Sequence, residues 1–544
     1  MYFKSSRRSY VPQKKERESL DLMPDDLATQ VERSNEKLPL WRKLGYAVGS
    51  MPYAMCNTVI GFYFTYFLLE AALVDATYAL VIILLGRVWD AISDPLCGYL
   101  CSRTKTRFGQ FRPWLLISAV PAALVYFGLW FVPNFSSSVL TFIYYLIMYL
   151  LFQTMLTCVH VPYTALTMHM SYSQKEIDSV TFYRVAFETI ATLLGVTVYT
   201  ISYAIFARDS SEDCTGTKTK DSDLVKAFRY HALFMSVLIV IMLFTTFFTV
   251  KEQKEMTDKK TKISLREAMK ETWCFKPYRE LFCIELFSWL AVQFGQGNLA
   301  FYIQYNLDLG NELPYFVFYL MVVNIIVLPL WQLTLRKFGK KTTFHIAAWF
   351  LLPSYLSFLF IDYYPHLIWI VGFIHGSGAS AIYMLPWSMI PDVVDYASLH
   401  SGIRREELYY SFFVFGNKFS SGITLGLSTG IYKLANYNQL SCEQPWTATL
   451  LFKLLVSTPT VLFIVVTLVF LWRYPITEKK RIEIKRKLLS LRKAITGESE
   501  KDYVGPDSSG LSDPEDERKE VETSGEELLT SADETENSFI HDNS

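Results

Sequence analysis

The fold is decided by the stretch ATYALVIILLGRVWDAISDPLCGYLC, residues 76–101. It is long enough to cross a bilayer as a helix, because a transmembrane helix needs about 20 mainly apolar residues. Three charged residues interrupt it, Arg87, Asp90 and Asp94. A charge near the middle of a membrane helix costs on the order of 3 kcal/mol, so such residues usually face a polar cavity and mark an ion or substrate path. Asp90 and Asp94 are one helical turn apart and are expected on the same face.

The composition of the whole chain also indicates a membrane protein. Of the 544 residues, 51% are hydrophobic and 16% aromatic, whereas Asp, Glu, Lys and Arg together make up only 19%. Soluble proteins contain less apolar and more charged sequence. Apolar runs of sufficient length predict an all-α membrane protein with twelve transmembrane helices, at residues 44–69, 76–101, 113–132, 139–168, 179–206, 229–250, 279–306, 313–335, 342–361, 367–390, 408–433 and 448–472.

The distribution of Lys and Arg predicts the orientation. The N-terminal tail and the connections after the second and eighth spans are rich in both, whereas the connections 70–75, 133–138, 307–312 and 362–366 contain neither. The positive-inside rule therefore predicts that both termini are cytoplasmic. The expected parts are a cytoplasmic tail (1–43), a six-helix half (44–250), a cytoplasmic linker with a short amphipathic helix (251–277), a second six-helix half (278–473), and a cytoplasmic tail that is first basic and then acidic and disordered (474–544).

The two predicted halves are weakly alike. The sequence RFGQFR at 107–112 follows the second span and KFGKK at 337–341 follows the eighth, while VPYT at 161–164 is echoed by LPWS at 385–388. Repeats at matching places are typical of transporters whose halves rock about a central site, although glycine-containing basic turns and helix prolines also recur by chance. No catalytic triad, phosphate-binding loop or metal-ligand cluster stands out. We therefore expect neither an enzyme nor an ATP-driven pump, and no cofactor.

Longer motifs carry a resemblance to a known family. GRVWDAISDP at 86–95, RFGQFRPW at 107–114, MIPDVVDY at 389–396 and GIRREE at 402–407 resemble the signatures of the glycoside-pentoside-hexuronide:cation symporters of the major facilitator superfamily. Within that family, CVHVPYTALTM at 158–168 resembles the branch that carries lysophospholipids with sodium.

This resemblance implies a multi-pass facilitator that imports a lysophospholipid, such as lysophosphatidylcholine with a long unsaturated acyl chain, by sodium symport. The plasma membrane is the expected location, with the endoplasmic reticulum as the other candidate, and a monomer is expected. The alternatives are a sphingosine-1-phosphate-type lipid exporter, a sugar:cation symporter, and a lipid scaffold or receptor that does not transport. We expect no nucleic-acid partner.

A cation site is expected at Asp90 and Asp94, with Thr157 as a further ligand. Sodium is a hard cation that prefers oxygen ligands, and the family's cation-binding aspartates match these two positions. Two alternatives remain at this point. A proton can replace sodium, because neighbouring carboxylates raise each other's pKa. Arg87 can instead neutralise Asp90 as a structural pair.

Five further residues are expected to bind the substrate or to couple it to the cation. Lys418 offers a positive charge to the two carboxylates when sodium is absent, or else extends to the cytoplasmic interface. Arg184 suits a phosphate because its planar fork makes two parallel hydrogen bonds, or else forms a gate salt bridge. His160 replaces the aspartate that sugar carriers of the family have before this proline motif. It is expected to contact a phosphate or to line the cation path, or else to be a buried neutral histidine bonded to a backbone carbonyl.

Trp387 suits a quaternary ammonium by cation–π attraction, or simply packs near a helix break. Gln296 stands where the lysolipid branch has an acidic residue, so the preferred head group is left open.

Two features are expected outside the membrane. Cys214 and Cys442 are the only cysteines in predicted extracellular loops, where the medium is oxidising. They are expected to form a disulfide bond, as in the lysolipid branch, with free thiols as the alternative. Asn134 begins the only external glycosylation sequon, Asn-Phe-Ser, but it lies close to the membrane.

Overall fold

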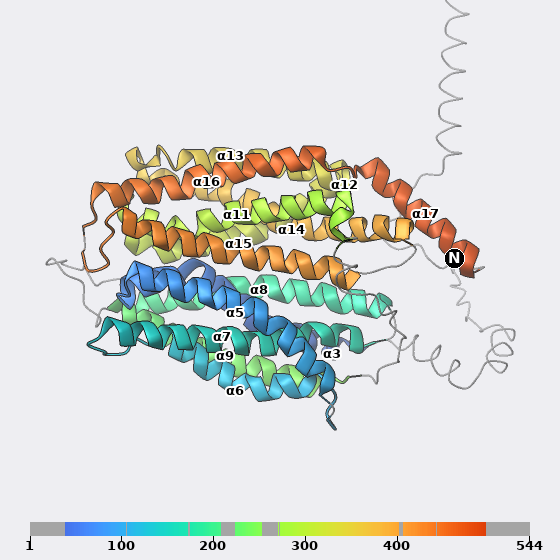
Figure 1. Ribbon diagram of the computed structural model, residues 1–544, viewed down its shortest axis with the longest axis horizontal. Coiled ribbons are helices and arrows are strands. Elements are labelled where there is room, and N and C mark those ends of the chain that lie inside the picture. The colour runs from blue at the N-terminus through green and yellow to red at the C-terminus, as the bar shows by residue number, and fades with distance from the viewer. Residues whose placement is uncertain are drawn as a thin grey trace, which may run out of the picture. The chain divides into compact units, whose positions relative to one another are not determined.

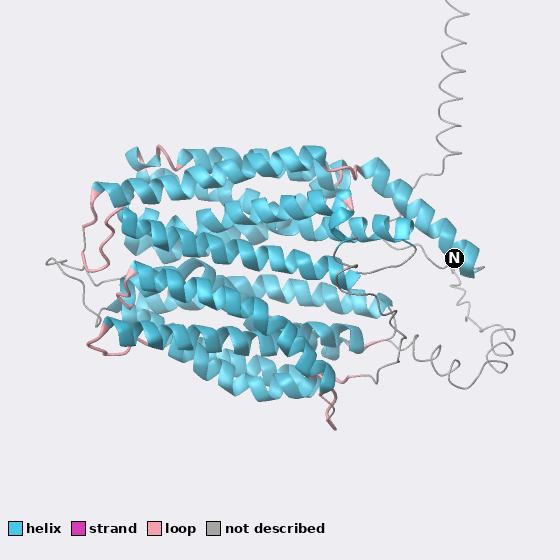
Figure 2. Cartoon of the chain, viewed as in Figure 1, coloured by secondary structure: helices cyan, strands magenta, loops and turns pink. Residues whose placement is uncertain are grey.

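The computed structural model describes residues 38–104, 106–171, 174–207, 223–252, 270, 272–401, 406–441 and 443–496. The chain divides into two compact units, Met1–Arg481 and Ile482–Ser544. All the segments that are predicted to span the membrane belong to the first unit. Figure 2 shows that nearly all of the described chain is helical. This follows from the apolar sequence, because in lipid every backbone polar group must find its partner within the protein, as it does in a helix.

The first half of the bundle is built from the five helices that follow a broken first span. These lie in the lower part of Figure 1. They are α5 (Ala76–Arg103), α6 (Arg112–Leu129), α7 (Ser138–Leu166), α8 (Gln174–Phe206) and α9 (Asp223–Thr249), with a 3₁₀ turn, η3 (Thr167–His169), after α7.

The described part of the second half has six α-helices, in the upper part of Figure 1. They are α11 (Lys276–Tyr305), α12 (Leu313–Phe338), α13 (Lys340–Ser357), α14 (Ile368–Ser401), α15 (Glu406–Leu434) and α16 (Trp446–Arg473), with 3₁₀ turns η4 (Gly310–Glu312), η5 (Ile361–Tyr363) and η6 (Pro365–Leu367) in the connections.

The prediction of twelve transmembrane helices in two halves is consistent with these elements. Eight helices among the described residues are long and apolar enough to cross a membrane by length and composition. The other predicted spans correspond to the broken first span and to α11, α13 and α15. Helices α11 and α15 contain buried polar residues, including Glu285, Asn298 and Ser420, which lower their average hydropathy.

The first span differs from the single helix predicted over 44–69. It consists of α3 (Leu40–Val48), α4 (Met51–Val59) and two π-helical segments, η1 (Ile60–Phe64) and η2 (Phe67–Ala71). Pro52 lies in the first turn of α4, and a proline cannot donate the hydrogen bond that would continue α3 through this point. Gly49 lies at the break, where a Cβ atom would stand 2.8 Å from the ring of Tyr163.

The linker and tail lie partly outside the described residues. Most of the predicted amphipathic linker helix falls there, and so does the predicted disordered segment from about residue 497. The basic segment before it forms α17 (Glu478–Thr496), a helix that the sequence reading did not predict.

The two halves meet along α5 and α15 and along α8 and α12. Three glycines on α15, at spacings of four residues, form the surface that faces α5. A Cβ atom at Gly422 would lie 2.7 Å from Cβ of Arg87, and one at Gly426 would lie 2.5 Å from Leu84. Small residues at this spacing let membrane helices approach closely, so these glycines set the distance between the halves.

At one end of the bundle, a buried carboxylate joins the halves. Glu70 of η2 accepts hydrogen bonds from Tyr305, at 2.5 Å, and from Tyr437, at 2.6 Å. Nearby, Tyr203 of α8 donates a hydrogen bond to Asn311 at 3.1 Å, and Lys433 lies 3.7 Å from Asp75. We call this end the closed end; it is on the left in Figure 1, where the connection between α15 and α16 lies.

Replacing Gly422 by alanine is expected to force α5 and α15 apart. The new methyl group would meet the start of the Arg87 side chain rather than a flexible tip, and overpacking of this kind costs about 1–3 kcal/mol. The melting temperature of the purified protein should therefore fall. Gly98→Ala is the matched control, because a Cβ atom there would meet only Val161 at an ordinary 3.9 Å. Equal melting temperatures for the two variants would contradict the close-packing account.

Candidate cation and substrate site

Helix α5 places the two aspartates. It begins after Asp75, whose side chain accepts a hydrogen bond from the backbone N–H of Thr77 at 2.8 Å, as an N-cap residue does. From that start, the helix carries Asp90 and Asp94 one turn apart on the face toward α7 and α15. The side chain of Asp90 is 8% exposed and that of Asp94 is 28% exposed. One carboxylate is therefore buried, and the other is partly accessible.

Hydroxyl groups fill the space between the carboxylates. The hydroxyl of Thr157, on α7, lies 3.0 Å from Oδ1 of Asp94 and 3.4 Å from Oδ1 of Asp90. Ser93 of α5 lies 3.1 Å from the Thr157 hydroxyl and donates to the Asp90 carbonyl. The residues predicted as cation ligands thus come together on two adjacent helices, with carboxylate and hydroxyl oxygens as the ligand set.

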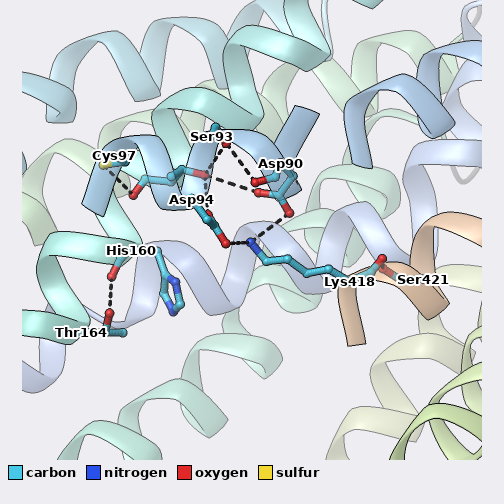
Figure 3. A network of polar contacts seen from close by, with 9 residues as sticks. Asp90, Ser93, Asp94, Cys97, His160, Thr164, Lys418 and Ser421 are labelled. Atoms are coloured by element: carbon cyan, nitrogen blue, oxygen red, sulfur yellow. Dashed lines mark hydrogen bonds and ion pairs between the residues drawn. The ribbon is translucent and has the colours of Figure 1, made fainter. Parts of the chain in front are cut away.

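Lys418 reaches this cluster from the other half of the protein. Its ammonium lies 3.1 Å from Oδ2 of Asp90 and donates a short hydrogen bond to Oδ2 of Asp94. Figure 3 shows the long side chain extending from α15 to both carboxylates of α5. The lysine side chain is 15% exposed. It therefore does not extend to the cytoplasmic interface, which was the alternative considered from the sequence. One ammonium therefore faces two carboxylates, and the three groups carry a net charge of −1 when all are ionised.

Arg87 takes no part in this ion pair. Within the described part of the chain, the ion pair of Asp90 is to Lys418 rather than to Arg87, and the buried Nε of Arg87 has no hydrogen-bond partner. The structural Arg87–Asp90 pair considered from the sequence is therefore wrong.

His160 lies beside the carboxylate cluster and stacks on a tyrosine. Its ring is 3.7 Å from that of Tyr53, on α4, with the planes 16° apart. Figure 3 places the imidazole near Asp94 and Lys418. This stacking restricts the plane of the imidazole.

Arg184, Gln296 and Trp387 have contacts of their own. Arg184 lies 3.6 Å from Glu188, one turn along α8. Gln296 accepts a hydrogen bond from Tyr383 at 3.1 Å.

Trp387 packs edge-on against Phe413 with ring centroids 5.1 Å apart. This contact joins α14 to α15.

The predicted extracellular features are described only in part. Cys214 and Cys442 lie outside the described residues, so their disulfide remains a prediction. Asn134 is exposed in the connection between α6 and α7, and its glycosylation remains a prediction.

Two residues of the site were missed from the sequence. Ser93 lies between the aspartates on the same turn of α5, so its position three residues after Asp90 was a signal that the spacing argument did not use. Tyr53 had no such signal, because it is one of 34 tyrosines and its contact with His160 joins positions more than one hundred residues apart.

Comparison with known proteins identifies the family of the chain. The family model "MFS/sugar transport protein" matches residues 45–478. The chain is 35% identical over 499 residues to the sodium-dependent lysophosphatidylcholine symporter 1-B of Danio rerio, covering 88% of this chain and 95% of that protein. It is 32% identical over 477 residues to a sphingosine-1-phosphate transporter of Xenopus tropicalis, covering 84% and 92% of the two chains.

A solved structure shares the fold at low identity. A bacterial homologue of the human lysosomal transporter Spinster, in an inward-facing and occupied conformation, superposes with a TM-score of 0.55 and 11% identity. The match covers 83% of this chain and 97% of that one. With a family model that matches most of its length, two relatives above 30% identity and a shared transporter fold, the chain belongs to the MFS/sugar transport protein family of multi-pass membrane transporters.

Proposed function

We propose that this protein is a sodium-dependent symporter that imports lysophospholipid, in particular lysophosphatidylcholine, across the plasma membrane by alternating access. The observation that carries the proposal is the cluster of Asp90, Asp94 and Thr157, closed by Lys418 from the opposite half. Similarity to sodium-dependent lysophosphatidylcholine symporters over most of the chain supports sodium as the cation and a lysolipid as the cargo.

The cation step is an exchange of positive charges. Sodium entering between the carboxylates and the Thr157 hydroxyl would be held by oxygen ligands of the kind it prefers. Two cations cannot share this small space without repulsion, so sodium displaces the ammonium of Lys418. Because Lys418 belongs to α15 and the aspartates to α5, this displacement removes an ionic link between the halves and allows them to move.

The substrate step uses the released lysine. An ammonium without a partner is costly in a membrane interior, and the phosphate of a lysolipid head group supplies the missing negative charge. Arg184 and His160 are the further candidates for the head group, and Trp387 and Gln296 for its choline end. Sodium and lipid would thus each favour binding of the other, as reciprocal linkage requires.

Closure at one end supports an alternating-access cycle. The hydrogen bonds of Glu70 to Tyr305 and Tyr437 hold the halves together at the closed end. By the positive-inside rule the closed end faces outward and both termini are cytoplasmic. We further propose a monomer, a disulfide between Cys214 and Cys442, and a glycan at Asn134.

Replacing Asp94 with asparagine is expected to abolish sodium-driven uptake of labelled lysophosphatidylcholine, because the amide removes a negative charge from the cation site. Uptake would be measured in sodium medium and in medium with sodium replaced by potassium. The control is Asp362→Asn, a carboxylate 2.6 Å from Lys453 elsewhere in the second half, which should retain sodium dependence. Sodium-dependent uptake by Asp94→Asn would refute the assignment of the cation site.

Replacing Lys418 with methionine is expected to strengthen sodium binding while it abolishes transport. The internal competitor is removed, and relief of coupling in the usual range of about 1–3 kcal/mol corresponds to roughly 5- to 150-fold tighter binding. The readout is the sodium concentration at which the melting temperature of the purified protein rises halfway. Lys433→Met is the control, because Lys433 is 61% exposed and pairs with Asp75. An unchanged midpoint for Lys418→Met would contradict the exchange of charges.

Competition tests the cargo. Unlabelled lysophosphatidylcholine should compete with labelled lysophosphatidylcholine, and glycosides should not, because the site offers His160 where family sugar carriers offer an aspartate. Similarity to a sphingosine-1-phosphate transporter makes that lipid the second candidate. Two results together would replace the first proposal with the second. Cells with the protein at their surface would take up no lysophosphatidylcholine, and they would release sphingosine-1-phosphate independently of sodium.

A further inference from the structure

A second polar cluster lies between α11 and α15, inside the second half. On α11 it comprises Glu285 and Ser288, each 1% exposed. On α15 it comprises Asn417, Ser420 and Thr424, at spacings that place them on one face of the helix. Helices α11 and α15 are in contact, and the hydroxyl of Ser420 donates to the backbone carbonyl of Leu286 at 3.3 Å. We call these five residues the α11–α15 seam.

Glu285 is the one ionisable residue of this seam. Its carboxyl oxygen Oε1 is buried and has no hydrogen-bond partner. The side chain of Asn417 lies within hydrogen-bonding reach of the carboxyl, and the amide oxygen of Asn417 is likewise buried without a partner. A carboxylate and an amide oxygen are both acceptors, so each of these adjoining groups has an acceptor that lacks a donor.

One hydrogen atom would satisfy both acceptors. A protonated carboxyl donates through its O–H group, and a primary amide both donates and accepts. Glutamic acid and asparagine can therefore pair through two complementary hydrogen bonds, whereas glutamate leaves the amide oxygen unpartnered. Buried polar atoms without partners cost about 1–3 kcal/mol each, so the seam is better satisfied with the proton present.

The charged groups around Glu285 also favour its protonated form. Charged and titratable groups lie on α11 and on four elements in contact with it. They are Lys276, Tyr278, Arg279, Glu280, Cys283, Tyr302 and Tyr305 of α11, Tyr409, Tyr410, Lys418, Tyr432 and Lys433 of α15, Lys453 and Arg473 of α16, His375, Tyr383, Asp392, Asp395, Tyr396 and His400 of α14, and Tyr63 of η1. Lys418, Lys433, Lys453 and Arg473 have carboxylate partners elsewhere, at Asp90 and Asp94, Asp75, Asp362 and Glu280, respectively. Lys276 and Arg279 are exposed in the first turn of α11.

Among the residues whose side chains are described, none forms an ion pair with Glu285. The side chains of Glu406 and Glu407, at the start of α15, do not belong to that described set. An ionised carboxylate without a cation is costly in such surroundings, and the neutral acid is not.

We propose that Glu285 and Asn417 form a proton-binding site in the second half, separate from the aspartate site on α5, with the proton held between Oε1 of Glu285 and Oδ1 of Asn417. Asn417 adjoins Lys418 in sequence, so the proton site and the lysine lie on the same turn of α15. Loss of the proton would place an unpaired charge between α11 and α15. Protonation therefore favours the packing of these two helices seen here, and uptake becomes dependent on pH.

Infrared difference spectroscopy on the full-length protein in lipid nanodiscs tests the site directly. At neutral pH, in potassium buffer, the wild-type protein should show a carboxylic-acid C=O band that shifts in heavy water and is lost in Glu285→Gln. Asn417→Leu should keep the band and move its frequency, because the amide partner is gone. Glu280→Gln is the matched control on the same helix, since Glu280 is 2% exposed but lies 3.3 Å from Arg473.

Two spectroscopic outcomes would overturn the proposal. If Glu285→Gln removes no acid band, Glu285 carries no proton. The second outcome is that sodium removes the Glu285 band of the wild-type protein and also removes it in variants of Asp90 or Asp94. The α11–α15 seam would then bind a metal cation instead of a proton. Neither result requires transport, so a failure of the lysophospholipid proposal would leave this test unaffected.

Uptake supplies a second readout. Between mildly acidic and mildly alkaline medium, at a fixed sodium gradient, wild-type uptake should change by about fivefold or more, the lower end of coupling between linked sites. Glu285→Gln, which mimics the protonated side chain, should show a flatter pH profile and retain its dependence on sodium. Identical pH profiles for the wild type and Glu285→Gln would refute the link between this proton and transport.

Discussion

The contact of one ammonium with two carboxylates across the bundle is the interaction on which the rest of the structure depends. Lys418 and the pair of Asp90 and Asp94 are each costly to bury alone, and each makes the other acceptable. The contact requires α15 to lie close against α5, which the glycines at 422 and 426 allow. The contact of Lys418 with the aspartates therefore depends on the close packing of the two halves.

The sequence predicted most of this arrangement because charge inside an apolar span is rare. Asp90 and Asp94 were predicted from their spacing within the second predicted span. Lys418 was predicted from its place in another apolar span, residues 408–433. Contacts between distant segments were less accessible. The stacking of Tyr53 on His160 depends on how α4 packs against α7, and the break in the first span depends on Pro52 and on π-helical turns that apolar composition does not reveal. Residue type indicated function only where that type was unusual for a membrane helix.

Buried polar groups in this protein are arranged by helix pair. The aspartates, Ser93 and Thr157 join α5 to α7, while Asn298 donates to Ser428 and accepts from Tyr432 to join α11 to α15. Helix α15 takes part in both sets, through Lys418 at the aspartates and through Ser428 and Tyr432 at Asn298. Helix α15 is thus the element through which a change at the cation site can reach the second half.

The closed end is held in a different way from the cation site. Glu70 is 6% exposed and is held by two uncharged phenol groups, whereas the pair of Lys433 and Asp75 beside it is open to solvent. Dissolved salt screens exposed ion pairs over about 8–10 Å but has little effect on a buried hydrogen bond. If this end faces outward, it meets the fluid from which sodium is drawn. The tyrosines then give a closure whose strength is independent of ionic strength, so the driving ion can be abundant without loosening the barrier against it.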